Sequence, residues 1–263
     1  WVSAVNGLAI GLLGLLAARN AHFAAGYEAM AALMVALFTA WYSAQVGPLE
    51  VNTVLVASLI VLLPGMMLTT AVNELAVQHL VAGMSRFAGA SAVLLKLVFG
   101  TAAGLEIATV LGFPQQVAQA QALSEPWAWL AVAVASLNFA LLFKADWRDY
   151  PLVMASAAAG FAVARLLGFN YGAEFAAFGA GLFVGVLSNV FARISNRPGA
   201  IVRVPGIIML VPGSASLRGL MSMVQQQDMV VGNSALLTVT NIVMALVAGL
   251  LFGNLLMPAR KNL

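Results

Sequence analysis

The sequence predicts an all-α polytopic membrane protein, because it is poor in charge and its apolar runs are long and continuous. Of the 263 residues, 62% are hydrophobic and 8% are charged, whereas about 25% of the residues in an ordinary soluble domain are charged. Apolar runs of about 20 residues, enough to cross a bilayer, recur along the chain. They are rich in Ala and Leu, unlike the alternating strands of about ten residues in a membrane β-barrel.

Nine membrane spans are expected from the apolar runs, each bounded by charge, proline or glycine. The 24 glycines suit a helical bundle, because small residues let helices approach one another closely in lipid. The expected spans are residues 1–18, 24–46, 51–76, 82–112, 127–143, 151–168, 174–194, 199–223 and 228–257.

Positive charges follow alternate spans, which predicts the orientation of the chain. Positively charged loops usually remain in the cytoplasm, so the C-terminus is expected inside and Trp1 outside. Because the sequence starts at Trp1 rather than Met, we expect that an N-terminal part of the protein precedes it. The charges that set this orientation are Arg19, Lys144, Arg148, Arg193, Arg197, Arg260 and Lys261.

Two stretches of the sequence resemble each other at an offset of 148 or 149 residues. LIVLLPGMMLTTAV at 59–72 corresponds to IIMLVPGSASLRGL at 207–220, and HLVAG at 79–83 corresponds to DMVVG at 228–232. Extended outward, this offset pairs the first four spans with the last four, so we predict two membrane repeats.

The two repeats are expected at residues 1–112 and 127–263, joined by an external linker at 113–126. If one span precedes Trp1, the intact protein has ten spans in two five-helix repeats. An odd number of spans reverses direction between copies, which is the inverted-repeat arrangement of many secondary transporters.

A Pro-Gly pair interrupts one span in each repeat, at Pro64-Gly65 and Pro212-Gly213. Proline removes a backbone donor and glycine tolerates unusual dihedral angles, so both spans are expected to break. A half-helix that restarts inside the membrane presents unpaired amides and a positive dipole end, which suit a carboxylate. A simple proline kink is the alternative at either site.

Polar residues follow each predicted break and are candidates for contacts with a substrate. Hydroxyl groups there can contact an amino acid, or they can bond to their own helix. Glu74 is a candidate for binding an ammonium group or a proton, or is an interfacial acid. The predicted substrate-binding set is Pro64, Gly65, Thr69, Thr70, Asn73, Glu74, Pro212, Gly213, Ser214, Ser216 and Arg218.

Lys96 and Glu106 lie well inside span 82–112, where charged groups are costly. Both are expected to find partners on other helices, and Glu106 is a second candidate for proton coupling, with a structural ion pair as the alternative. Arg203, one turn into its span, is expected to extend to the cytoplasmic face.

Several functional classes are not supported by the sequence. It contains no Cys and none of the motifs of metalloproteases, P-loop NTPases or serine hydrolases. The basic residues form no run that would suit nucleic acid. The chain is therefore predicted to be no enzyme, to hold no metal or cofactor, and to bind no nucleic acid.

The stretches VLLPGMMLTTAVNELAVQHLVAGMSRFAGA at 61–90 and VPGIIMLVPGSASLRGLMS at 204–222 resemble the two halves of the threonine/serine exporter family. The resemblance covers essentially the whole chain and implies a bacterial inner-membrane exporter of small amino acids, driven by protons. The resemblance also implies ten spans preceded by a cytoplasmic region, so we expect that region and the first span before Trp1. Split relatives are linked to dicarboxylate export. The family usually has Asp where this chain has Glu74. The carboxylate is thus retained, on a side chain that is longer by one methylene group.

The expected function is therefore secondary export of small amino acids in exchange for protons. The alternatives are export of dicarboxylates such as succinate, a scaffold subunit that transports nothing, and a passive channel. The sequence is also compatible with a homo-oligomer.

Overall fold

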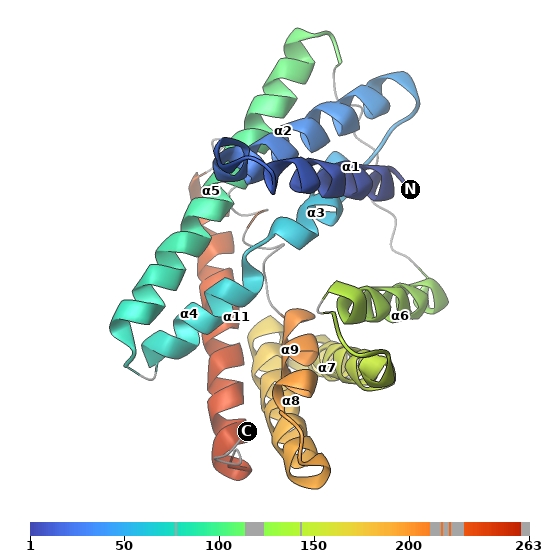
Figure 1. Ribbon diagram of the computed structural model, residues 1–263. Helices are drawn as coiled ribbons and strands as arrows, with labels where there is room; N and C mark the ends of the chain where they lie inside the picture. The colour runs from blue at the N-terminus through green and yellow to red at the C-terminus, as the bar shows by residue number, and fades with distance from the viewer. Residues whose placement is uncertain are drawn as a thin grey trace. The chain divides into compact units, whose positions relative to one another are not determined.

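The computed structural model describes residues 1–76, 78–113, 124–142, 144–210, 217, 221 and 229–258, without the side chains of residues 21, 72, 73, 76 and 229–236. Every regular element in this part of the chain is a helix, as predicted (Figure 1). The helices are α1 (Val2–Ala17), α2 (Ala21–Gln45), α3 (Val51–Leu59), η1 (Ile60–Leu62), α4 (Gly65–Ala76), α5 (Leu80–Val110), α6 (Glu125–Leu142), η2 (Trp147–Asp149), α7 (Tyr150–Tyr171), α8 (Ala173–Ser195), α9 (Ala200–Ile208) and α11 (Met229–Leu256).

Six stretches of the described helices are long and apolar enough to span a bilayer, and a seventh is counted if a bent pair is taken as one span. The six lie in α2, α5, α6, the η2–α7 segment, α8 and α11. The bent pair joins Val51–Leu62 to Gly65–Ala71, and α1 is a shorter apolar helix. Because α9 covers only the first part of the expected span 199–223, the count of nine spans stays a prediction.

The chain divides into two compact units, each made of three separate stretches. Unit 1 contains α1, α2, α3 and most of α5. Unit 2 contains α4, α6, α7, α8, α9 and the C-terminal part of α11. Unit 1 comprises Trp1–Pro64, Ser85–Gln121 and Gly213–Val239, and unit 2 comprises Gly65–Met84, Ala122–Pro212 and Thr240–Leu263.

In unit 1, α5 packs directly on α2 because two glycines remove the side chains between them. A Cβ at Gly100 would lie 2.2 Å from the carbonyl oxygen of Ala29, and one at Gly104 would lie 2.6 Å from that of Leu33. Glycines four residues apart let two membrane helices approach to backbone contact. This packing fixes the register of α5 against α2.

Unit 2 repeats this contact between α11 and α8. A Cβ at Gly249 would lie 2.1 Å from the carbonyl oxygen of Phe178, and one at Gly253 would lie 2.9 Å from that of Leu182. Each of these four residues stands 149 positions after its counterpart at Gly100, Ala29, Gly104 and Leu33. The repeat predicted from the Pro-Gly phrases is therefore also a repeat of helix packing.

A buried polar contact ties together the first three helices of unit 1. The Asn6 side chain on α1 donates to Thr39 on α2 at 3.2 Å and to Ser58 on α3 at 3.1 Å. All three side chains are almost completely buried, and buried polar groups are stable only when hydrogen-bonded. In unit 2, α7, α8 and α9 likewise pack on one another.

Candidate functional site

The helix expected to break at Pro64-Gly65 does break there. Its last turn is the 3-10 helix η1, and the chain leaves the helical conformation at Leu63, which has φ −66° and ψ 128°. The residue before a proline is forced away from helical dihedrals by the proline ring, and α4 restarts at Gly65. The first turn of α4 therefore presents backbone amides that have no partner within the helix.

The polar side chains that follow this break lie on α4. The hydroxyl of Thr69 donates to the Gly65 carbonyl at 3.2 Å, and that of Thr70 donates to the Met66 carbonyl at 2.8 Å. Thr69 is buried, and Thr70 and Glu74 are half-buried. Each threonine oxygen keeps lone pairs that can accept a further hydrogen bond. The side chain of Asn73 is not among those that the structure describes.

A tight hairpin joins α4 to α5. Gln78 has φ 66°, and the amides of Gln78 and His79 donate to the Leu75 and Glu74 carbonyls at 3.1 and 2.8 Å, which is the Schellman pattern of a helix C-terminus. A Cβ at Gly83 would lie 2.7 Å from the Leu75 side chain. The glycine shared by HLVAG and DMVVG thus has a packing role in the first copy.

The predicted site residues of the second break, Pro212, Gly213, Ser214, Ser216 and Arg218, lie outside the described residues. Two residues just beyond them are described. Leu217 and Met221 are buried in the hydrophobic core of unit 1, with Leu55 and Leu59 of α3.

The segments that follow the two Pro-Gly pairs are exchanged between the units. Met66 packs against the core of unit 2, which includes Val184 and Leu246, whereas Leu217 packs in the core of unit 1. The stretch that follows the first Pro-Gly pair therefore belongs to unit 2, and the stretch that follows the second belongs to unit 1.

Lys96 has the partners from another helix that were expected of it. Its ammonium group donates to the Ala25 carbonyl at 2.9 Å and lies 3.4 Å from the carboxylate of Glu28, both on α2. Glu106 lies exposed on α5, and no residue in the described part of the chain is bonded to its side chain. The expected partner for Glu106 is therefore not found there.

Arg203 makes contacts within unit 2 that the sequence did not indicate. Its Nε donates to the Ser188 hydroxyl at 3.1 Å, and its Nη2 donates to the side-chain oxygens of Asn189 at 2.8 Å and Asn254 at 3.4 Å. The expected extension of this side chain to the cytoplasmic face stays a prediction. We call Ser188, Asn189, Arg203 and Asn254 the Arg203 cluster.

Two ion pairs of unit 2 join charged residues near helix ends. Arg197 holds Asp149 through two bonds of 2.6 and 2.5 Å, and Arg165 pairs with Glu125. The hydrogen bonds to Asp149 raise the pKa of Arg197 above its ordinary value. Asp149 directly precedes α7 and Arg197 follows α8, whereas Glu125 begins α6 and Arg165 lies within α7.

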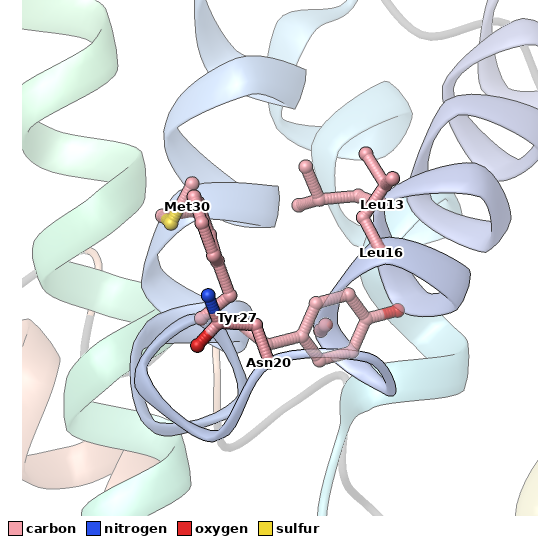
Figure 2. Close-up of a pocket in the computed structure, with 7 residues that line it drawn as sticks. Leu13, Leu16, Asn20, Tyr27 and Met30 are labelled. Carbon is pink, nitrogen blue, oxygen red and sulfur yellow. The ribbon is translucent and has the colours of Figure 1, made fainter.

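A cavity of about 220 Å³ lies between α1 and α2 in unit 1 (Figure 2). Asn20 and Tyr27 are the polar side chains in its wall, and the Tyr27 hydroxyl donates to the Ile10 carbonyl at 3.1 Å. No charged side chain lines it, so it offers nothing to the charged ends of an amino acid. The lining consists of Leu13, Leu16, Ala17, Asn20, Phe23, Tyr27 and Met30.

Among the described residues, no group of three His, Asp or Glu side chains lies close enough to hold a metal ion. The polar groups that the described residues do offer are hydrogen-bonding side chains and charges within apolar helices.

Comparison with known proteins places both halves of the chain in one family. The family model described as "Threonine/Serine exporter, ThrE" matches residues 128–256, and a second threonine/serine exporter model matches residues 1–108. No solved structure matches the chain.

Curated relatives named pheromone-regulated membrane protein 10 also resemble the chain. The protein of Eremothecium gossypii is 28% identical over 86% of this chain and 32% of its own length. That of Candida albicans is 30% identical over 68% of this chain and 17% of its own length, and that of Zygosaccharomyces rouxii is 25% identical over 86% and 24%. The chain thus spans a third or less of these relatives.

Proposed function

Because the chain belongs to the threonine/serine exporter family, we propose that it is a secondary transporter that exports small amino acids of the threonine and serine type. The observation that carries the proposal is the break at Pro64-Gly65, where a membrane helix ends in one unit and restarts in the other. Broken helices are tolerated in membranes where protein or a water-filled cavity satisfies the freed backbone groups. Such a break therefore supports a solute site at mid-membrane.

In this proposal, the amides at the start of α4 bind the carboxylate of the substrate. The threonine hydroxyls donate to the backbone, which orients their lone pairs to accept hydrogen bonds from an ammonium or hydroxyl group. Glu74 supplies the negative charge for the ammonium group. The proposed substrate-binding set is Pro64, Gly65, Thr69, Thr70, Asn73, Glu74, Pro212, Gly213, Ser214, Ser216 and Arg218.

We assign proton coupling to Glu74 or Glu106. A carboxylate within a span is costly when charged, and Glu106 is exposed without a bonded partner in the described part of α5 and its neighbours. Taking up a proton removes its charge while one unit moves against the other. An exchanger needs a group of this kind, loaded alternately with a proton and with substrate.

The proposal also includes the inverted orientation of repeats 1–112 and 127–263, the external position of the linker 113–126, and a cytoplasmic C-terminus. Loop charges support this orientation, and the family resemblance supports a bacterial cytoplasmic membrane. The relatives named above are fungal, so the kind of membrane is itself part of the proposal.

Flux into proteoliposomes tests the function. Purified protein is reconstituted, and uptake of labelled serine, threonine and succinate is followed with and without a pH gradient. Serine and threonine uptake that rises with the gradient is expected. Flux of succinate alone would establish the dicarboxylate alternative, and electrical conductance without proton coupling would establish a channel. No flux of any of the three contradicts the proposal.

A further inference from the structure

The Arg203 cluster in unit 2 contains hydrogen-bond donors that have no acceptor among the described residues. Arg203 uses Nε and Nη2, and Asn189 donates to the side-chain oxygen of Asn254 at 2.8 Å and to the Met257 carbonyl at 2.6 Å. Within the described part of unit 2, the Nη1 group of Arg203 and the Nδ2 group of Asn254 donate to no acceptor. Neither nitrogen is fully enclosed. Two neighbouring donor groups therefore remain accessible.

The charge of Arg203 is not balanced by a carboxylate. Its acceptors are a hydroxyl and two amide oxygens, and Asp149 of the same unit is paired with Arg197. Ser188 and Asn189 are almost completely buried, so this part of the guanidinium group lies away from water. A cation in such surroundings is stabilised when an anion binds to its free edge.

The first repeat forms the same helix packing without this cluster. The residues 149 positions before Ser188, Asn189, Arg203 and Asn254 are Thr39, Ala40, Val54 and Leu105, so three of the four polar side chains have an apolar counterpart. Ala40 and Leu105 are buried in the apolar core of unit 1. The cluster is therefore not required for the contact between these helices, which indicates a role other than packing.

We propose that Arg203 and Asn254 bind the carboxylate group of the transported solute, in a second site apart from the helix breaks. Asn189 lies near the end of α8 and bonds to Met257 just after the end of α11, an end that the loop charges place in the cytoplasm. A carboxylate held there is bound where an exported solute enters. The assignment of the ligand rests on the proposed function, and the anion site itself rests on the cluster.

Binding to the full chain in lipid nanodiscs tests this site. The probes are labelled L-serine and the competitor L-serinamide, which lacks the carboxylate. The wild-type protein is expected to prefer L-serine by about tenfold or more, the effect of one charge-assisted hydrogen bond. Arg203→Gln is expected to reduce that preference, because the proposed site at the start of α4 still binds a carboxylate, whereas the control Arg165→Gln, which removes an exposed arginine of the same unit, is expected to keep it in full.

A triple variant separates binding from folding. Asn189→Ala, Arg203→Val and Asn254→Leu together introduce the residues of the first repeat at these three positions, and they are expected to keep the Tm of the wild-type protein while reducing the preference for L-serine. A triple variant that fails to fold would assign the cluster a structural role and overturn the site. So would an unchanged preference in Arg203→Gln, or wild-type protein that does not distinguish L-serine from L-serinamide.

The outcomes also distinguish this inference from the proposed function. Flux of serine together with an unchanged preference in Arg203→Gln overturns the site and leaves the exporter intact. Binding that depends on Arg203, without flux of any amino acid, overturns the exporter and leaves the anion site.

Discussion

Leu63 and Met66 stand three residues apart on either side of Pro64-Gly65 and pack into different hydrophobic cores. Leu63 packs against the core of unit 1 and Met66 against that of unit 2. Beyond the second Pro-Gly pair, Leu217 lies in the core of unit 1, while Leu210 before it packs in unit 2. The chain thus passes from one unit to the other at both Pro-Gly pairs.

Gly249→Ala is expected to destabilise unit 2, because its Cβ would lie 2.1 Å from the Phe178 carbonyl oxygen and α11 would have to move away from α8. Overpacking of this kind costs about 1–3 kcal/mol, seen as a lower Tm in detergent. Gly11→Ala is the control, since a Cβ on that helical residue meets nothing within 4 Å. Equal Tm values for the two variants would contradict the packing.

Lys96→Met is expected to lower the Tm and the yield of folded protein. It leaves Glu28 on α2 without the cation that lies 3.4 Å away, and an unpaired carboxylate in a span is costly. Adding Glu28→Gln to Lys96→Met removes that charge and is expected to restore much of the loss. A double variant less stable than the single variant would show that the pair does not act as a unit.

Glu106→Gln is expected to uncouple transport from protons. An amide cannot take up a proton, so exchange of labelled for unlabelled serine should continue while uptake driven by a pH gradient is lost. The matched control is Glu174→Gln, an exposed acid at the start of α8. If uptake driven by the pH gradient persists in Glu106→Gln, then Glu106 is not the coupling residue, and Glu74 is the remaining candidate.

The ion pair between Asp149 and Arg197 predicts an unequal response to the loss of each partner. The Asp149 side chain is 9% exposed and that of Arg197 is 46% exposed. Arg197→Gln leaves a nearly buried carboxylate without its cation, whereas Asp149→Asn leaves a guanidinium group that water can reach. Thermal unfolding should show the larger fall in Tm for Arg197→Gln. The reverse order would mean that Asp149 is solvated by other groups.

The helices could be predicted from the sequence because they depend on local patterns. Apolar runs end at charges and glycines, so the expected span 174–194 differs by only one residue at each end from α8 (Ala173–Ser195). The break before Gly65 was predictable because proline acts on its immediate neighbours. The offset between the Pro-Gly phrases also locates the glycine contacts of α5 and α11.

The side-chain partners could not be predicted, because they depend on contacts between distant helices. Glu28 meets Lys96 only because Gly100 sets the register of α5 against α2. Arg203 meets Asn189 and Asn254 from two other helices. Neither the Lys96–Glu28 pair nor the Arg203 cluster corresponds to a sequence motif. Asn189 and Asn254 are, however, polar residues within apolar helices, and that pattern could have indicated a polar contact between helices.

The most direct test of the account compares serine flux in Gly65→Leu, Gly213→Leu and the control Gly11→Leu in proteoliposomes, with size-exclusion profiles to establish folding. A leucine side chain in either Pro-Gly pair is expected to fill the position where the half-helix restarts and reduce flux at least about tenfold, equivalent to about 1.4 kcal/mol. Gly11→Leu should transport as the wild-type protein does. Full flux in folded Gly65→Leu and Gly213→Leu would contradict the claim that substrate passes the two broken helices.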